Sequence, residues 1–180
     1  MSELLKHIKS RIALKGPLSV SDYMKEALFN SEYGYYMTGD PLGKRGDFIT
    51  APEISQMFGE LIGLWCAVMW EKMGSPAKIN LIEMGPGRGT LMADALRATS
   101  AVPGFFGAIN IHMIETSLSL KKRQKRNLQA LNSNITWHKS FQDVSEGPFI
   151  LIANELFDVL PIRQFVKSTN GWLERKVGCN

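Results

Sequence analysis

The sequence contains very little cysteine. Cys66 and Cys179 are the two cysteines among 180 residues, and they offer neither a disulfide framework nor the ligand spacing of a zinc site. No apolar run approaches the roughly 18 residues of a membrane span. The first residues, which include Glu3, have neither a signal-peptide nor a transit-peptide pattern. We therefore expect no metal site, no membrane span and a cytoplasmic location, with the mitochondrial matrix as the less favoured alternative.

A strong excess of charge is also lacking. The net charge of +4 and the pI of 9.1 allow weak contact with polyanions without requiring it. The basic run at residues 121–126 has neither aromatic side chains nor a known nucleic-acid module beside it, so we predict a solvated helix face and no nucleic-acid partner. Because 44% of the residues are hydrophobic, the chain can build a substantial core.

Apolar periodicity predicts alternating helices and strands after an N-terminal helical region. The predicted strands are residues 78–84, 108–114, 135–137 and 149–152, with a hairpin at 162–177, and the predicted helices are residues 3–14, 19–30, 50–73, 91–98 and 118–131. Residues 32–47 contain too many glycines and prolines for a regular element and are predicted as a loop, either a lid or plain surface. We expect an α/β fold in which residues 1–74 form a helical cap with this loop and residues 75–180 form a partial Rossmann-like core.

The helix predicted at 50–73 has two notable features. Thr50 and Glu53 have the spacing of a capping box at its start. Its large apolar side chains recur at three- and four-residue steps, and we expect this stripe to pack in the core. The stripe consists of Ile54, Met57, Phe58, Leu61, Ile62, Trp65, Val68 and Met69.

A glycine-dense turn follows the first predicted strand. Residues 81–90 read Leu-Ile-Glu-Met-Gly-Pro-Gly-Arg-Gly-Thr, with glycine at every second position after the acid and its neighbour. Such a turn lets the backbone approach a nucleotide-like ligand, although a tight turn with no ligand is the alternative. A P-loop is excluded because no lysine precedes Thr90. A dinucleotide fingerprint is disfavoured because Thr90 replaces its third glycine and because Glu115 lies 30 residues after Gly85 (115 − 85).

Polar side chains follow the other predicted strands. Glu115 ends the second strand, where a carboxylate can accept both ribose hydroxyl protons or cap a helix. Ser140 and Phe141 follow the third strand, where an adenine ring could be held. Three residues after the fourth strand form either a substrate site or the cap of a short helix, namely Asn154, Glu155 and Asp158.

Four ordered blocks resemble the MidA family, which includes a mitochondrial complex I assembly factor that is a protein arginine methyltransferase. The blocks are residues 34–37 (Gly-Tyr-Tyr-Met), 46–55 (Gly-Asp-Phe-Ile-Thr-Ala-Pro-Glu-Ile-Ser), 83–91 (Glu-Met-Gly-Pro-Gly-Arg-Gly-Thr-Leu) and 154–161 (Asn-Glu-Leu-Phe-Asp-Val-Leu-Pro). The resemblance implies a class I methyltransferase fold with S-adenosyl-L-methionine as donor. It also implies symmetric dimethylation of an arginine on a complex I subunit as the activity. The missing transit peptide makes this member look bacterial.

For such a reaction we hypothesise roles for the polar and glycine residues. Glu155, with Asp158 in support, is expected to pair with the acceptor guanidinium, because arginine stays protonated at neutral pH and has to be oriented instead. In the donor site, the glycines would cradle the methionine part, Glu83 would act on its ammonium and Glu115 would hold the ribose. The expected donor-binding residues are Glu83, Gly85, Pro86, Gly87, Gly89, Glu115, Ser140, Phe141 and Asn154.

The chain departs from the family pattern in its number of strands. It supplies about four strands and a hairpin, whereas a class I sheet has about seven. We expect a sheet that is incomplete at the C-terminus, with an unpaired edge that favours association, for example into a homo-oligomer. A fragment, a shortened gene product and half of an assembly are all open explanations. An inactive methyltransferase-like binding or assembly protein is the second functional hypothesis, and a nicotinamide oxidoreductase is a disfavoured third.

Overall fold

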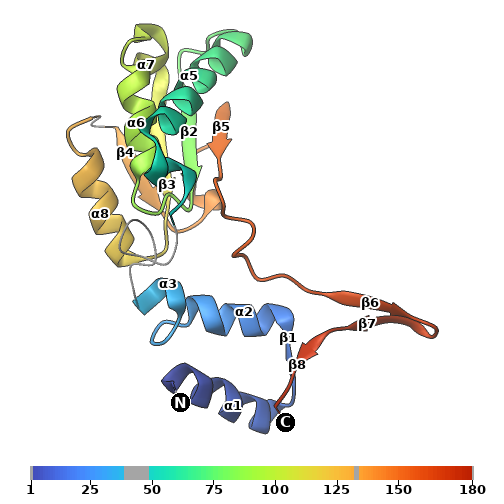
Figure 1. Cartoon of the computed structure of the whole chain (residues 1–180). Coiled ribbons are helices and arrows are strands. Elements are labelled where there is room, and N and C mark those ends of the chain that lie inside the picture. Colours follow the sequence, from blue (N-terminus) through green and yellow to red (C-terminus); the bar gives the residue numbers. More distant parts are fainter. Residues whose placement is uncertain (1, 39–48, 132–133, 180) are drawn as a thin grey trace. The chain divides into compact units, whose positions relative to one another are not determined.

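The computed structural model describes residues 2–38, 49–131 and 134–179 (Figure 1). The chain divides into two compact units, one of residues 1–41 and 157–180 and the other of residues 42–156. This division differs from the predicted boundary between residues 74 and 75, because the helix at 56–72 packs within the second unit, against the helix that follows the glycine turn.

A four-stranded parallel sheet forms the centre of the unit of residues 42–156. Its strands are β2 (Ile79–Met84), β3 (Ile109–Ile114), β4 (Ile135–His138) and β5 (Phe149–Ile152), in the order β4-β3-β2-β5. The four predicted strands and the α/β fold are confirmed. Because all four strands are parallel, their carboxyl ends lie at one edge of the sheet. Association of two copies through the edge of β5 stays a prediction.

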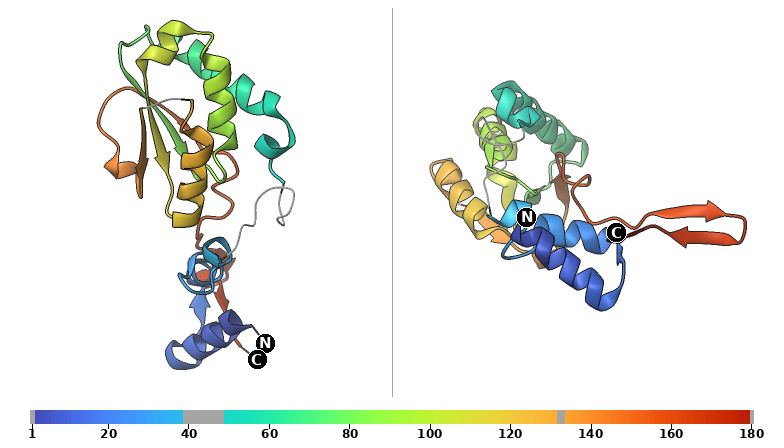
Figure 2. Two further views of the ribbon diagram at one scale, coloured as in Figure 1. Left: turned by 90° about the vertical axis from the view of Figure 1, so that its left-hand side faces the viewer. Right: turned by 60° about the horizontal axis from the view of Figure 1, so that its bottom comes forward.

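Helices cover one face of this sheet (Figures 1 and 2). They are α5 (Gln56–Lys72), α6 (Thr90–Thr99), α7 (Pro103–Ala108) and α8 (Leu118–Leu128). Alternate strand residues, such as Leu81, Ile111 and Met113, point into the core beneath these helices. Residues 103–107, which lie between the predicted helix 91–98 and the predicted strand 108–114, form most of α7, and Pro103 is compatible with the first turn of this helix.

The packing of α5 corrects the predicted core stripe. The large apolar side chains of that stripe are mostly on the solvent side, with Met57 63%, Leu61 58% and Trp65 52% exposed. The buried face consists of Gly59, Gly63, Cys66, Ala67 and Trp70. The small residues of this face let α5 approach α6 closely, and hydrophobic periodicity missed it because the pattern counts large side chains. The helix predicted at 50–73 is also interrupted, since Ser55 is extended between α4 (Ala51–Ile54) and α5.

We expect Gly63→Ala to lower the free energy of unfolding by about 1–3 kcal/mol through overpacking. A Cβ at Gly63 would lie 2.6 Å from the carbonyl oxygen of Ala95 and 2.7 Å from its Cα, both of which are backbone atoms of α6. Gly107→Ala in α7 is the matched control, because nothing lies within 4 Å of the added Cβ. Urea unfolding followed by circular dichroism measures both variants, and an equal effect of the two would contradict the close packing of α5 on α6.

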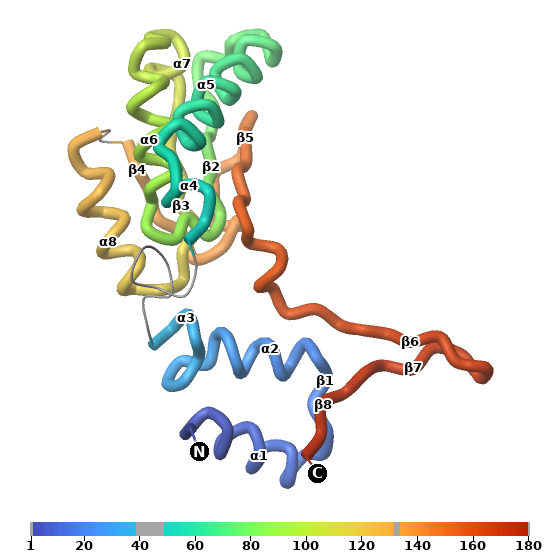
Figure 3. Tube along the Cα trace, in the orientation of Figure 1, coloured from blue at the N-terminus to red at the C-terminus, as the bar shows by residue number. Residues whose placement is uncertain are grey.

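The other unit contains the N-terminal helices and the C-terminal hairpin (Figure 3). Its elements are α1 (Glu3–Lys15), β1 (Leu18–Ser19), α2 (Val20–Phe29), α3 (Tyr35–Thr38), β6 (Phe165–Ser168), β7 (Gly171–Glu174) and β8 (Lys176–Val177). The hydroxyls of Ser2 and Ser19 cap α1 and α2. The predicted hairpin is confirmed as β6 and β7, and β8 pairs with β1. The predicted loop 32–47 contains α3, and its residues 39–47 lie outside the described residues.

Candidate functional site

The glycine turn connects β2 to α6 and has a left-handed backbone. Gly85, Gly87 and Gly89 have φ angles of 64°, 53° and 78°, a region that residues with a Cβ rarely adopt. A Cβ at Gly85 would also lie 2.7 Å from Cδ1 of Leu156, and a Cβ at Gly89 would lie 3.2 Å from Cγ of Gln124. The turn is closed by a hydrogen bond of 2.7 Å from the Gly89 N–H to the Pro86 carbonyl. The conformation of the turn therefore favours glycine at all three positions, and the neighbouring side chains leave little room for a Cβ at Gly85 and Gly89.

Glu83 lies beneath the turn with its side chain in the core. It is 3% exposed, and its carboxylate accepts a hydrogen bond from the Met92 N–H in the first turn of α6. Gly89, the N-cap residue, has no side chain to do this, so Glu83 takes over the capping of α6. Burial raises the pKa of Glu83 to about 8, against the opposing effect of the Met92 N–H. Its Oε2 has no hydrogen-bond partner among the described residues.

Glu115 lies at the carboxyl end of β3, and each of its carboxylate oxygens accepts a hydrogen bond. Its Oε1 accepts a hydrogen bond of 2.8 Å from the Ser117 N–H, and its Oε2 accepts one of 3.0 Å from Nε2 of Gln124. Burial raises the pKa of Glu115, while these hydrogen bonds act in the opposite direction. A carboxylate oxygen has two lone pairs, so each oxygen keeps acceptor capacity for a hydroxyl group.

Gln124 of α8 brings the glycine turn and Glu115 together. Its Nε2 donates to the Gly87 carbonyl at 2.8 Å as well as to Glu115, and its Oε1 accepts from the indole N–H of Trp137 at 2.9 Å. Gln124 was not among the predicted site residues because it stands within the basic run 121–126. Its position was detectable, since Leu120, Gln124 and Leu128 recur at four-residue steps and all three are buried.

A second unpredicted contact holds the turn from α4. The Glu53 carboxylate accepts hydrogen bonds from Nη1 of Arg88 at 3.2 Å and from Oγ1 of Thr90 at 2.5 Å. The predicted capping box is wrong, because Thr50 makes no side-chain cap hydrogen bond and Glu53 binds the glycine turn instead. Glu53 is thus joined to residues 35 and 37 positions away in the sequence.

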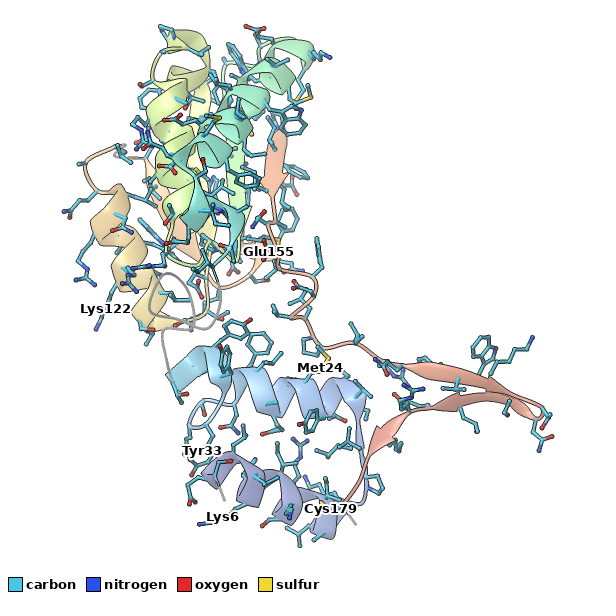
Figure 4. The ribbon with its side chains drawn as sticks, viewed as in Figure 1. Lys6, Met24, Tyr33, Lys122, Glu155 and Cys179 are labelled. Carbon is cyan, nitrogen blue, oxygen red and sulfur yellow. The ribbon has the colours of Figure 1, made fainter. Side chains whose placement is uncertain are left out.

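The segment after β5 also reaches the turn. Leu156 lies against Gly85, so the chain that carries Asn154 and Glu155 passes beside the glycine turn. Glu155 is exposed and has a φ of 48°, which is unusual for a non-glycine residue and costs of order 1 kcal/mol or more. Figure 4 labels Glu155 where the chain leaves β5. Asp158 belongs to the other unit, so its pairing with Glu155 stays a prediction.

Ser140 and Phe141 are not brought to the glycine turn by any contact of the described residues. Phe141 begins the short helix η1 (Phe141–Asp143), and its ring lies 5.7 Å from that of Phe149, measured between centroids. Phe149 is the first residue of β5, whereas the site lies at the carboxyl ends of the strands. Ser140 forms a capping box with Asp143. The hydrogen bonds and ring contacts of both residues are therefore accounted for by local structure.

Metal-ligand clusters and membrane-spanning helices are both absent from the described part of the chain. No cluster of three or more His, Cys, Asp or Glu side chains that could hold a metal ion occurs among residues 2–38, 49–131 and 134–179. Within the same ranges, every helix is too short or too polar to cross a bilayer.

Comparisons with known proteins agree on one family. Residues 61–180 match a family model described as "Putative S-adenosyl-L-methionine-dependent methyltransferase". The chain is 43% identical over 192 residues to the mitochondrial protein arginine methyltransferase NDUFAF7 of Danio rerio, covering 95% of this chain and 46% of that protein. The corresponding protein of Homo sapiens is 38% identical over 196 residues, with 97% and 44% covered.

Solved structures give the same result for the fold. A crystal structure of a COG1565 superfamily member from Burkholderia thailandensis, bound to S-adenosyl-homocysteine, superimposes with a TM-score of 0.79 at 26% identity. The superposition covers 98% of this chain and 46% of that chain. The chain thus spans somewhat less than half the length of the relatives it matches.

The names of the curated relatives correct the predicted location. These relatives are named as mitochondrial proteins. Their names conflict with the predicted cytoplasmic, bacterial location and with the prediction that the mitochondrial matrix is the less favoured alternative. The prediction was wrong because it depended on the first residues of a sequence that spans only part of its relatives.

Proposed function

The chain belongs to the family of S-adenosyl-L-methionine-dependent methyltransferases, and from that membership we propose that its glycine turn and Glu115 bind S-adenosyl-L-methionine for methyl transfer to a protein arginine. The observation that carries the proposal is the hydrogen bonding of one side chain, Gln124, to both the Gly87 carbonyl and the Glu115 carboxylate. These contacts join the glycine turn to Glu115 at the carboxyl ends of parallel strands, where sheets of this kind commonly bind nucleosides, and this supports the proposal.

Two features of the turn fit a sulfonium nucleoside with an amino acid part. Oε2 of Glu83 is buried without a partner among the described residues, and an ammonium group at the turn would stabilise its ionised form. The left-handed glycines leave the backbone without side chains on the ligand side, as close approach requires. The B. thailandensis structure contains S-adenosyl-homocysteine, the demethylated form of the same molecule.

The bound donor would supply an activated methyl group on sulfur, and the residues of the chain would bind and orient. Glu115 would hold the ribose hydroxyls through its remaining lone pairs, and the turn would hold the methionine part. Ser140, Phe141 and Asn154 stay predicted contacts of the adenine and the donor. Methyl transfer between positioned partners depends mainly on proximity and orientation, which rigid contacts such as those of Gln124 and Glu53 provide.

The acceptor side of the proposal concerns Glu155. A guanidinium is charged at neutral pH, so a carboxylate is needed to orient one nitrogen toward the methyl group. Glu155 is exposed beside the glycine turn and has a strained backbone, a combination that is common at functional sites. We propose Glu155 as this carboxylate, Asp158 as its support, and a subunit of respiratory complex I as the protein substrate.

Calorimetry and methyl labelling test the proposal. The chain is expected to bind S-adenosyl-homocysteine and to transfer label from methyl-labelled S-adenosyl-L-methionine to dissociated complex I, with the label recovered as methylated arginine after hydrolysis. Glu155→Gln is expected to reduce transfer about 10-fold without changing the affinity for S-adenosyl-homocysteine, because it removes a charge-assisted hydrogen bond to the acceptor alone.

Three outcomes would count against separate parts of the proposal. No binding heat would overturn the donor site. Label in a residue other than arginine would overturn the acceptor class but not the donor. Unchanged transfer by Glu155→Gln would remove Glu155 from the mechanism, with Glu146→Gln, an exposed glutamate in the connection before β5, as the control.

A further inference from the structure

Gln124 is fully buried, although all five other residues of the run 121–126 are lysine or arginine and none of them is buried. Its amide has a single chemically consistent orientation. The indole of Trp137 can only donate a hydrogen bond, and the Gly87 carbonyl and the ionised Glu115 can only accept one. The oxygen of the amide must therefore face Trp137, and both N–H groups of Nε2 are used by the turn and the acid.

The two bonds donated by Nε2 fix different parts of the site. The bond to the Gly87 carbonyl fixes the orientation of the peptide group between Gly87 and Arg88. In a trans peptide the N–H points opposite to the carbonyl, so the Arg88 N–H faces away from α8. The bond to Oε2 of Glu115 fixes the rotation of the carboxylate at the tip of β3. One planar amide thereby sets the distance between these two groups.

We propose that Gln124 is a positioning residue of the donor site, which locks the glycine turn and the Glu115 carboxylate at the separation that a bound nucleoside with its amino acid tail requires. The inference rests on the proposed function, since it concerns the same site. Trp137 acts one step further out by fixing the amide of Gln124. The buried position of Gln124 favours a rigid lock, because close packing around a fully buried side chain restricts its rotamers.

A separate consequence concerns the ionisation of Glu115. Burial raises its pKa most, and the N–H groups of Ser117, Gln124 and Thr116 act against burial. These are the groups that act on this carboxyl, and none of them is charged. Burial raises the pKa of Glu115, and the hydrogen bond from Gln124 lowers it. When the Gln124 donor is removed, the pKa of Glu115 therefore rises further.

The test uses Gln124→Met, which keeps a flexible side chain of similar length and removes both donors. Calorimetry is done with S-adenosyl-homocysteine and with its 2′,3′-dideoxy analogue, which lacks the hydroxyls that Glu115 would hold. The affinity of the variant for S-adenosyl-homocysteine is expected to fall about 10-fold. The loss of affinity caused by removing the hydroxyls should be large in the original chain and small in the variant. If Gln124 had only a structural role, Gln124→Met would lose the same factor of affinity for S-adenosyl-homocysteine and for the dideoxy analogue. That result would overturn the proposal.

Asn127→Ala is the matched control. Asn127 lies on the same helix and donates to the Arg88 carbonyl of the turn at 2.9 Å, but it has no bond to Glu115. When the ribose hydroxyls are removed from the ligand, Asn127→Ala should lose as much affinity as the original chain does. We call this loss of affinity the hydroxyl sensitivity. If Gln124→Met fails to fold, Trp137→Phe keeps an aromatic ring in the core, removes the N–H that orients the amide, and should change the hydroxyl sensitivity in the same direction. An unchanged sensitivity in Trp137→Phe would then overturn the proposal.

A measurement without ligand separates this inference from the proposed function. Carbon-13 labelling of the glutamate carboxyls allows the titration of Glu115 to be followed by NMR. The pKa of Glu115 should be higher in Gln124→Met than in the original chain and unchanged in Asn127→Ala. If the original chain binds neither nucleoside, the proposed function fails, and this titration still decides whether Gln124 controls Glu115. An unchanged pKa in Gln124→Met would overturn the proposed lock.

Discussion

Replacing Gly85 with valine is expected to abolish detectable binding of S-adenosyl-homocysteine, with the affinity falling at least about 100-fold. Gly85 has a φ of 64°, which a β-branched residue does not adopt without strain. Its Cβ would lie 2.7 Å from Cδ1 of Leu156, so that side chain would also have to move. Both effects fall at the turn that would receive the methionine part of the donor. Isothermal titration calorimetry measures the loss.

Gly74→Val is the control that separates the site from backbone strain alone. Gly74 follows α5, has a φ of 87°, and has nothing within 4 Å of an added Cβ. This variant should lose some stability, of order 1 kcal/mol, because the left-handed conformation is lost or strained, but it should bind S-adenosyl-homocysteine normally. If Gly85→Val bound the ligand as well as Gly74→Val does, the glycine turn would not be the donor site.

The strands and the turn were predictable because their signals are local. Short apolar runs define β2, β3, β4 and β5, and the alternation of strands and helices defines a parallel sheet. The carboxyl ends of parallel strands share one edge, so the order of residues alone places Glu115 near the glycine turn. The contact through Gln124 agrees with that expectation.

The contacts that hold the turn were not predictable by the same reasoning. The spacing of Thr50 and Glu53 fits a capping box, which is a local pattern. In the structure, however, the Glu53 carboxylate binds Arg88 and Thr90, which lie 35 and 37 residues further along the chain. The buried face of α5 depends on small residues, which carry no hydrophobic signal of their own. Both errors arise where a tertiary contact overrides a local preference, and such contacts cannot be read from spacing alone.

The residues expected around the adenine stay a prediction. Ser140 and Phe141 were assigned to the donor site because they follow a strand, and their contacts among the described residues are with η1 and β5. Phe141 packs on Phe149 at the opposite end of β5 from the site. The path of a loop after a strand depends on the residues against which the loop packs. Here Phe141 packs on the ring of Phe149, and a pattern of strands and helices does not reveal this contact.

Glu83→Gln is expected to remove most of the pH dependence of stability between pH 5 and pH 8. Burial raises the pKa of Glu83 in the folded chain from 4.5 to about 8, so the folded state keeps a proton that the unfolded state releases. The contribution of Glu83 to the free energy of unfolding is therefore highest below about pH 4.5 and decreases as the pH rises toward 8. A shift of this size corresponds to a loss on the order of 4 kcal/mol.

Glutamine has the shape of protonated glutamate and can still accept the Met92 N–H that caps α6, but it does not titrate. The variant should therefore be more stable than the original chain at pH 8 and about equally stable at pH 5. Urea unfolding at a series of pH values gives both curves, with the exposed Glu146→Gln as the control that leaves the profile unchanged. Parallel curves for Glu83→Gln and the original chain would mean that Glu83 is ionised at neutral pH without a ligand. The Oε2 atom, which has no partner among the described residues, would then already be stabilised, and the fit of this position to the ammonium of a donor would lose its physical basis.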